Sequence, residues 1–286
     1  MYSTPTSEAC AERAASQATA RAAYPKRLDL LPTEELEAGA YRLRFARSHG
    51  ELEAIERLRF AVFNLELGEG LEHSFLTGRD EDEFDANCHH LLVEHCQPGA
   101  EPRIIGTYRL QTAELAAAGA GFYTNGEYDL SALPPAMLAD GVELGRACIA
   151  AEHRKKPVLF LLWRGLALYI SHTRKQYFFG CCSLTSQDPI DGWRAYRQLE
   201  QAGALAEFQA PARPPFACLP PLSGTELPPI VLPPLFDIYL RFGSQVCGPP
   251  ALDTEFKTID FLVCFDLGRI DPRTRAMFFP AGEESA

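Results

Sequence analysis

Long hydrophobic runs are missing from this sequence of 286 residues. No apolar stretch approaches the roughly 20 residues that a helix needs to cross a bilayer, so no transmembrane segment is expected. The first apolar residues are small alanines mixed with charged side chains, which predicts no secretory signal peptide. Positive charge is also scarce, and the formal net charge of −11 argues against nonspecific binding of nucleic acid.

Cysteine pairs and short catalytic motifs are missing as well. The nine cysteines form no C-x-x-C pair and no disulfide framework, which favours a reducing, cytoplasmic location. There is no G-x-S-x-G elbow, no P-loop and no His-x4-Asp pattern of the kind found in glycerolipid acyltransferases. The segment from Cys88 to Cys96 holds two cysteines and three histidines, but their spacing fits no standard zinc site, so no metal is expected.

The hydrophobic patterning predicts one domain of mixed secondary structure. Residues 1–40 are rich in alanine and poorly patterned, and we expect them to form a poorly ordered N-terminal tail. Residues 41–286 are expected to form a single domain, since 47% hydrophobic residues suffice for a full core. The expected order is strand 41–45, a helix over 52–65, paired strands 89–95 and 103–110, strand 142–149, helix 158–170 and strand 177–184. This order predicts a mixed α/β sheet rather than a regularly alternating parallel one.

One predicted strand, Val142–Ile149, carries two charges in an apolar setting. Glu143 and Arg146 each need a partner or a substrate, because burial of an unpaired charge costs several kcal/mol. In a regular strand their side chains point to opposite faces of the sheet. A β-bulge at Gly145 would change that, since glycine inside a strand often marks a bulge. A structural ion network remains the alternative to a functional site.

Several short segments, taken together in their order and spacing, resemble a known family. They are Phe84-Asp85, His90-Leu91-Leu92-Val93, Gly106-Thr107-Tyr108-Arg109-Leu110, Glu127-Tyr128-Asp129-Leu130, Glu143-Leu144-Gly145-Arg146 and Leu232-Pro233-Pro234-Leu235. Across roughly residues 41–270 the chain resembles the Gcn5-related N-acyltransferase (GNAT) fold, in the branch of acyl-homoserine-lactone synthases and ornithine-lipid N-acyltransferases. The second group is the closer match. The resemblance implies an α+β fold whose central sheet is mixed, mostly antiparallel and flanked by helices.

The resemblance also implies a reaction. Enzymes of this kind move a long-chain, often 3-hydroxylated fatty acyl group from acyl carrier protein to the α-amine of an amino acid, here most closely ornithine, to give a lyso-aminolipid. The phosphopantetheine-linked donor is then a substrate, and no cofactor is expected. Two alternatives remain open: an acyl-homoserine-lactone synthase, which uses S-adenosylmethionine as acceptor, and a non-catalytic member of the fold. Peripheral contact with the inner face of the membrane is also left open.

The resemblance carries over to individual residues. Four are assigned to catalysis because a carboxylate must remove a proton from the attacking amine and guanidiniums hold carboxylates in place: Glu143, Asp82, Asp85 and Arg146. Five are assigned to substrate binding: Arg59, Phe63, Asp80, Arg109 and Trp163. Asp80 stands where the lactone synthases carry a glutamate. Trp163 and Phe178 are expected to line the acyl tunnel, although core packing would explain the same residues.

The basic turn before helix 158–170 indicates the donor. Acetyl-CoA enzymes of this fold bind the pyrophosphate with backbone N–H groups of a glycine-rich loop. Here the corresponding run, Arg154-Lys155-Lys156-Pro157, contains no glycine, and Pro157 has no N–H to donate. We therefore expect Arg154, Lys155 and Lys156 to contact a single phosphopantetheine phosphate and an acidic carrier protein.

Overall fold

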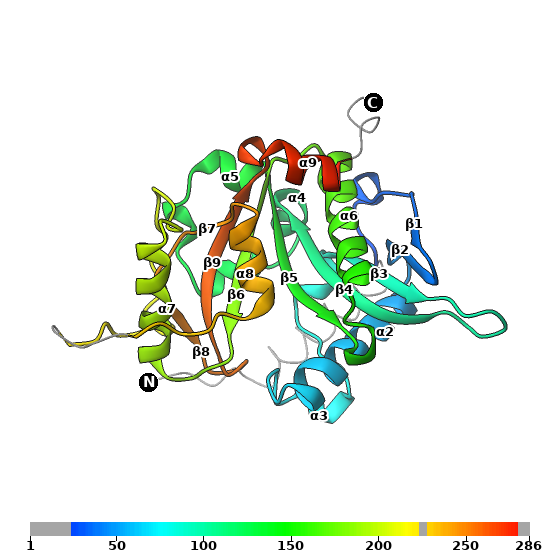
Figure 1. Cartoon of the computed structure of the whole chain (residues 1–286). Coiled ribbons are helices and arrows are strands. Elements are labelled where there is room, and N and C mark those ends of the chain that lie inside the picture. The colour runs from blue at the N-terminus through cyan, green and yellow to red at the C-terminus, as the bar shows by residue number, and fades with distance from the viewer. Residues whose placement is uncertain (1–23, 223–227, 280–286) are drawn as a thin grey trace.

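The sheet at the centre of the molecule joins segments from almost the whole chain. In the computed structural model, which describes residues 24–222 and 228–279, it has nine strands in the order β1-β2-β3-β4-β5-β6-β9-β7, with β8 also paired to β9 (Figure 1). All neighbours are antiparallel except β5 and β6, which are parallel. The strands are β1 (Leu36–Ala38), β2 (Tyr41–Phe45), β3 (His89–His95), β4 (Arg103–Thr112), β5 (Gly141–Ile149), β6 (Tyr177–Leu184), β7 (Gln245–Val246), β8 (Ala251–Asp253) and β9 (Thr258–Asp266).

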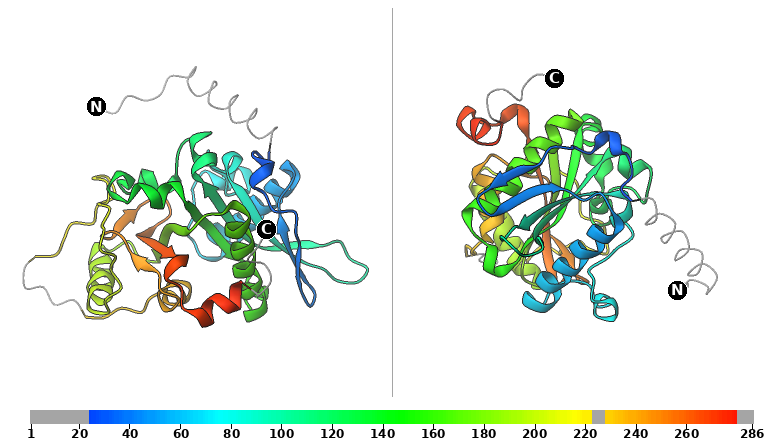
Figure 2. Two further views of the ribbon diagram at one scale, coloured as in Figure 1. Left: turned by 90° about the horizontal axis from the view of Figure 1, so that it is seen from above. Right: turned by 90° about the vertical axis from the view of Figure 1, so that its right-hand side faces the viewer.

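Helices cover both faces of this sheet (Figure 2). One face packs against α6 (Lys156–Thr173), α7 (Pro189–Gln201), α8 (Pro234–Arg241) and α9 (Pro272–Phe278). The other face packs against α2 (His49–Phe60), α4 (Ala113–Ala117) and α5 (Pro135–Ala139), while α3 (Ser74–Thr77) lies beyond the end of α2. The arrangement confirms the predicted mixed, mostly antiparallel sheet flanked by helices.

The main core lies between α6 and the strands β2 to β5. Leu161, Leu162 and Tyr169 of α6 are almost fully buried against strand residues such as Leu43 and Leu91. Pro157 lies in the first turn of this helix, where its missing N–H costs no hydrogen bond. The predicted helix 158–170 is therefore confirmed, with two to three further residues at each end. In the described parts of the chain, even this apolar helix and its neighbours fall short of what a membrane-crossing helix requires.

The N-terminal segment is more ordered than its sequence predicts. Tyr24 is buried, and its hydroxyl lies 3.1 Å from Nδ1 of His90. Leu31 is also buried, and β1 pairs with β2. The prediction of a poorly ordered tail over residues 1–40 is thus wrong for residues 24–40, and residues 1–23 lie outside the described part. These few apolar residues are too sparse to show a periodicity, but each of them fills a site in the tertiary structure.

The parallel pair β5 and β6 separates soon after it begins. Only Gly141–Glu143 pair with Tyr177–Phe179, and beyond them β5 pairs with β4 alone while β6 pairs with β9. Gly180 stands at the point of separation with φ +154°, and a Cβ there would lie 2.2 Å from the Leu144 carbonyl oxygen. Backbone groups on the facing edges of the two strands therefore remain open for a ligand.

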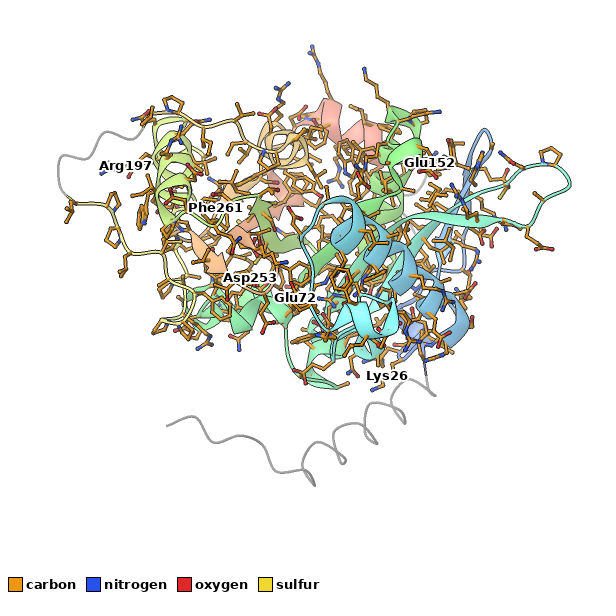
Figure 3. The ribbon with its side chains drawn as sticks, turned by 90° about the horizontal axis from the view of Figure 1, so that it is seen from below. Lys26, Glu72, Glu152, Arg197, Asp253 and Phe261 are labelled. Atoms are coloured by element: carbon orange, nitrogen blue, oxygen red, sulfur yellow. The ribbon has the colours of Figure 1, made fainter. Side chains whose placement is uncertain are left out.

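The segment after α2 closes one end of this opening. Phe63 lies in a π-helical stretch, Ala61–Glu66, and its ring centroid is 6.3 Å from that of Phe256 in the turn between β8 and β9. Lys257 of the same turn forms an ion pair with Glu72 at 2.8 Å. Figure 3 views this end from below, with Glu72 and Asp253 labelled near its middle.

Candidate active site

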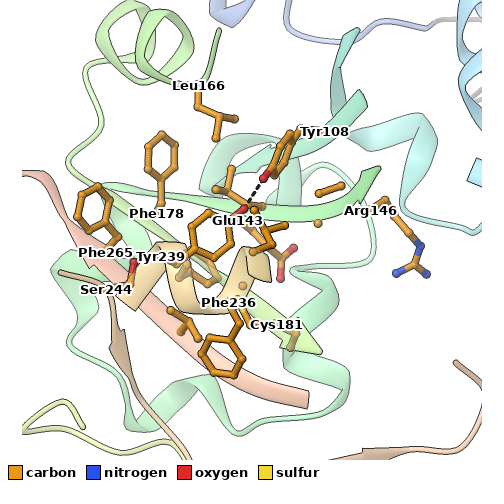
Figure 4. Close-up of a pocket in the computed structure, with 18 of the residues that line it drawn as sticks. Tyr108, Glu143, Arg146, Leu166, Phe178, Cys181, Phe236, Tyr239, Ser244 and Phe265 are labelled. Carbon is orange, nitrogen blue, oxygen red and sulfur yellow. Dashed lines mark hydrogen bonds between the residues drawn. The ribbon is translucent and has the colours of Figure 1, made fainter. Parts of the chain in front are cut away.

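A cavity of about 360 Å³ occupies the opening between β5 and β6. It is lined by side chains from both faces of the sheet, so it passes through the sheet (Figure 4). The half on the side of α6, α8 and α9 is apolar and includes Trp163, Leu166, Phe178, Phe236, Phe265 and Ile270. The other half carries the polar groups Tyr123, Thr124, Glu143, Asp253 and Asp260.

A β-bulge shapes the wall of the cavity formed by β5. Gly145 pairs with Arg109 and Cys148 with Thr107, so two residues of β5, Arg146 and Ala147, stand opposite one residue of β4. Arg146 has φ +47°, a left-handed conformation that is uncommon for a residue with a side chain. The predicted bulge exists, one residue beyond Gly145. It brings the Arg146 guanidinium to the polar half of the cavity, on the same face as Glu143.

Glu143 is held by backbone N–H groups rather than by a cation. The N–H of Thr124 donates to Oε1 at 2.7 Å and the N–H of Tyr123 donates to Oε2 at 2.9 Å. Burial raises the pKa of the Glu143 carboxyl, and these two hydrogen bonds only partly oppose the shift. No Lys, Arg or His of the described chain forms a salt bridge with it, so a structural pair between Glu143 and Arg146 is ruled out here.

Behind the cavity wall, three arginines and three aspartates form one charge-balanced network. Fully buried Arg59 donates to Asp80 at 2.8 Å and to both oxygens of Asp85 at 2.7 and 3.0 Å. Arg109 reaches Asp85 at 3.1 Å and Asp82 at 2.6 Å. Arg146 completes the network with contacts of 3.1 Å to Asp82 and 3.5 Å to Asp80. The network fixes the two guanidiniums that face the cavity.

The environment of Asp85 argues against the prediction that this residue acts in catalysis. Burial by itself raises the pKa of this carboxyl, but the Arg59 guanidinium and a hydrogen bond from His90 outweigh burial and hold the pKa well below its usual range. Asp85 is fully buried and does not line the cavity. A carboxylate that binds protons so weakly is a poor base. Asp85 therefore positions Arg59 and Arg109.

Asp82 has a similar role, and two predicted substrate contacts also lie out of reach. Burial of Asp82 is outweighed by Arg109 and Arg146, which lower the pKa of its carboxyl. Arg59 and Asp80 are fully buried and do not line the cavity, so the prediction that these two residues bind substrate is not supported. Their contribution is to hold the network together.

Five of the nine residues assigned to catalysis or substrate binding line the cavity: Phe63, Arg109, Glu143, Arg146 and Trp163. Phe178, expected beside Trp163, lines it too. The guanidiniums of Arg109 and Arg146 lie over the Tyr123 ring, at 5.2 and 4.8 Å from its centroid. Arg146 also lies 4.1 Å from the centroid of Phe256. Such stacked, paired guanidiniums are rigid and keep N–H groups available for an incoming carboxylate. Trp163 belongs to the apolar half, where its ring packs edge-on against Phe242.

Comparison with known proteins identifies the family. Residues 58–164 match the model of the acetyltransferase (GNAT) domain. An L-ornithine N(alpha)-acyltransferase of Brucella abortus is 31% identical over 252 residues, which cover 82% of this chain and 87% of the relative. Another from Agrobacterium fabrum is 32% identical over 245 residues, with 82% and 84% covered. The chain belongs to this family of L-ornithine N(alpha)-acyltransferases. Among solved structures, the acyl-homoserine-lactone synthase LasI has a TM-score of 0.47 at 14% identity, with 84% and 94% covered.

Family membership confirms the predicted GNAT fold and the prediction that the protein is an acyltransferase. The thiols near the reaction centre do not suit a covalent mechanism. Burial raises the pKa of Cys181 well above its usual value and that of Cys148 to about 12. A protonated thiol is a weak nucleophile, so direct attack by the acceptor amine fits this acyltransferase better.

The basic turn lies outside the cavity, at the N-terminus of α6. Arg154 forms a two-pronged ion pair with Glu66 at 2.5 and 2.8 Å and also donates to the Ile149 carbonyl. Lys155 and Lys156 are exposed. Of the three predicted carrier contacts, Arg154 is thus engaged within the acyltransferase itself, and the two lysines face solvent.

A second set of carboxylates, at or just behind the polar half of the cavity, was not predicted from the sequence. These are Asp260 on β9, Asp253 at the end of β8, and Glu127 just behind Cys181. Asp260 lies within an otherwise apolar strand, Thr258–Asp266. The same signal that singled out Glu143, a carboxylate inside a buried strand, would have found it.

Proposed function

We propose that this acyltransferase transfers a long-chain acyl group from acyl carrier protein to the α-amine of ornithine. The observation that carries the proposal is the cavity that passes through the sheet, with an apolar half on one face and a charged half on the other. The names of the relatives, L-ornithine N(alpha)-acyltransferases, support ornithine as the acceptor. The product would be an Nα-acylornithine.

The apolar half suits the donor chain. Its walls come from α6, β9 and the α8 and α9 regions, and they offer aromatic and aliphatic side chains such as Trp163, Leu166 and Phe265. Burial of each methylene of an acyl chain in such a wall contributes about 0.8 kcal/mol. An acetyl group would leave most of this surface unused.

The charged half suits the chemistry. The amine nitrogen attacks the thioester carbonyl carbon, a C–N bond forms, the C–S bond breaks, and the sulfur leaves as the thiol of phosphopantetheine. The amine must lose protons, and burial raises the pKa of three cavity carboxyls, those of Glu69, Glu143 and Asp260. Glu143 is the strongest candidate base, because backbone N–H groups orient both of its oxygens beside the open edge of β5. Arg109 and Arg146 would bind the acceptor carboxylate through charge-assisted hydrogen bonds.

The edge of β5 suits the developing oxyanion. Beyond Glu143 this strand pairs on one side only, so backbone N–H groups near the bulge at Arg146 face the opening. A preorganised N–H aimed at the carbonyl oxygen is worth roughly 100- to 1,000-fold in rate. No residue of the chain need form a covalent intermediate.

Mass spectrometry of purified reactions tests the proposal. The enzyme is incubated with ornithine and one of three donors: a C16 acyl carrier protein, its 3-hydroxy counterpart, or acetyl-CoA. We expect Nα-acylornithine from one or both carrier-protein donors, with the acyl position established by fragmentation. Equal or better turnover with acetyl-CoA would reject the carrier-protein donor, and acylation of the side-chain amine would reject the acceptor geometry.

A further inference from the structure

A group of carboxylates in the polar half has no cation of its own. We call Glu127, Asp253 and Asp260 the acidic cluster; all three are buried. Among the described residues, no Lys, Arg or His forms a salt bridge with any of them. This contrasts with the neighbouring network, where each aspartate has an arginine partner.

Glu127 points most directly to a ligand-binding role for the cluster. Its side chain is 2% exposed, and its Oε1 accepts no hydrogen bond from any described group. Oε2 receives a weak contact from the Cys181 thiol at 3.6 Å, and the Glu127 carboxyl also interacts with that of Asp260. Burial and the neighbouring Asp260 charge raise the pKa of Glu127 well above its usual value. One carboxylate oxygen each from Glu127 and Asp260, together with the Cys181 sulfur, all lie within 4.8 Å of one another. Burial and mutual repulsion therefore favour a proton on this carboxyl pair, and a positive group bound between the two would favour their charged forms instead.

The cluster is placed next to the reaction centre. Asp253 and Asp260 line the same cavity as Glu143, and Cys181 of β6 lies between the two acidic regions. The charges of Glu127, Asp260 and Glu143 all act on the Cys181 thiol and add to the effect of burial in raising its pKa. A small ligand held at Glu143 by one end would therefore extend toward Asp260 with its other end.

We infer that Asp260, backed by Glu127, binds the side-chain ammonium of the acceptor and so selects amino acids that carry a second amine. The inference rests on the proposed function, in which the α-amine of an amino acid is acylated beside Glu143. The Phe256 and Tyr123 rings flank the same polar half and offer apolar surface to the methylene groups between the two amines. Asp260 and Glu127 supply the negative charge. The arginines of the neighbouring network are paired with Asp80, Asp82 and Asp85 instead, so they do not neutralise it.

The chemistry of the cluster favours an ammonium over a metal ion. Its sulfur ligand is a thiol whose pKa is raised well above the usual value, and metals bind the thiolate. The cluster offers no imidazole. An ammonium needs only acceptor oxygens around it, which Glu127 and Asp260 provide.

Kinetics with two acceptors of equal length test the inference. Ornithine and norvaline share the same carbon chain, but norvaline lacks the side-chain amine. Asp260→Asn and Glu127→Gln remove charge with little change in shape, and Asp266→Asn on the same strand is the matched control, because Asp266 lies outside the cavity. We expect the two cluster variants to lose roughly 10- to 100-fold in kcat/KM for ornithine, mainly through KM, and to keep their activity with norvaline.

Equal losses with both acceptors would overturn the inference. A wild-type enzyme that acylates norvaline and ornithine with equal kcat/KM would overturn it too, but would leave the proposed acylation of amino acids intact. Calorimetric titration with 1,4-diaminobutane, without any donor, gives a readout independent of turnover. Binding that Asp260→Asn abolishes supports the subsite even if no amino acid is acylated. Zn²⁺ binding that depends on Asp260 and resists displacement by the diamine would assign the cluster to a metal instead.

Discussion

The Thr124 backbone N–H donates a 2.7 Å hydrogen bond to Oε1 of Glu143 and so fixes the carboxylate from a 3-10 turn nineteen residues earlier in the chain. The Tyr123 N–H holds the second oxygen. The carboxylate is therefore oriented without a salt bridge to any described side chain, and burial keeps its pKa raised although the nearby Arg109 charge lowers it. An oriented carboxylate with a raised pKa is a better base than one paired to an arginine.

Glu143→Gln tests this role. The variant keeps the size of the side chain and loses the base, so kcat should fall roughly 100- to 10,000-fold. Stability should fall by only about 1–3 kcal/mol, because one backbone hydrogen bond is lost. Steady-state kinetics and thermal unfolding on one sample check both values. In the wild type, activity should fall as pH is lowered through the raised pKa, because the base works only when ionised; an active variant would move the base elsewhere.

Asp85→Asn probes the buried network. The substitution removes one of the three negative charges and leaves Arg59 and Arg109 under-neutralised, so we expect a loss of about 3–5 kcal/mol in the free energy of unfolding. Glu152→Gln is the control, since its pair with Arg103 is exposed and worth about 0–1 kcal/mol. Urea denaturation of both variants gives the comparison. Similar small losses would mean that the network contributes little to stability.

Ala167→Leu tests the acyl half of the cavity. Ala167 of α6 lines the cavity, while the next residue, Leu168, does not. Added volume at residue 167 should shift the preferred donor to shorter chains, because the longest chain no longer fits. Leu168→Phe adds volume to the same helix outside the cavity and should leave the chain-length profile unchanged. Products from mixed C8 to C18 donors, compared by mass spectrometry, decide between these outcomes.

The exposed lysines at the start of α6 test carrier binding. Replacement of both Lys155 and Lys156 by alanine should raise the KM for acyl carrier protein roughly 2- to 10-fold and flatten its dependence on salt. Arg154→Ala should have the smaller effect on salt dependence, because Arg154 is already paired with Glu66. Arg197→Ala, an exposed site on α7, is the control. No change in KM at low salt would exclude this turn from the docking surface.

His89 predicts a pH-dependent stability. Burial lowers the pKa of His89 to about 4, and its ring is held between the Lys26 carbonyl at 2.7 Å and the Tyr169 hydroxyl at 2.8 Å. Above pH 6.5 the ring is neutral in both the folded and the unfolded state. As pH falls from 6.5 to about 4, only the unfolded chain gains the proton, so folding loses up to roughly 3 kcal/mol.

Comparison with His89→Gln isolates this contribution, because other groups titrate in the same range. Between pH 7 and pH 5 the free energy of unfolding of the wild type should fall by about 2 kcal/mol more than that of the variant. Chemical denaturation at the two pH values provides the measurement. Parallel pH profiles would show that folding does not lower the pKa of His89.

Much of the fold follows from local patterns in the sequence. The alternation of Tyr41–Phe45, the apolar run of His89–His95 and the continuous apolar stretch within α6 each predict the element that forms there. The site could be located for the same reason: Glu143 and Arg146 stand out because charge is expensive inside a buried strand. The strands β7 and β8, of two and three residues, were not predicted, since such short elements carry too little periodicity. Helix α7, Pro189–Gln201, was not predicted either, although it spans 13 residues.

The sequence by itself determined which residues must be buried and which charges would need partners, because burial patterns and charge costs are local properties of each segment. Only the tertiary structure decided the pairing. Arg146 meets Asp82 across 64 residues, and a bulge, not the strand period, turns its side chain toward the cavity. Glu143 takes backbone N–H groups as partners, whereas Asp260 and Glu127 form no salt bridge with any cation of the described residues. Such choices depend on distances between segments that are remote in the chain, and the strand and helix periods contain no information about them.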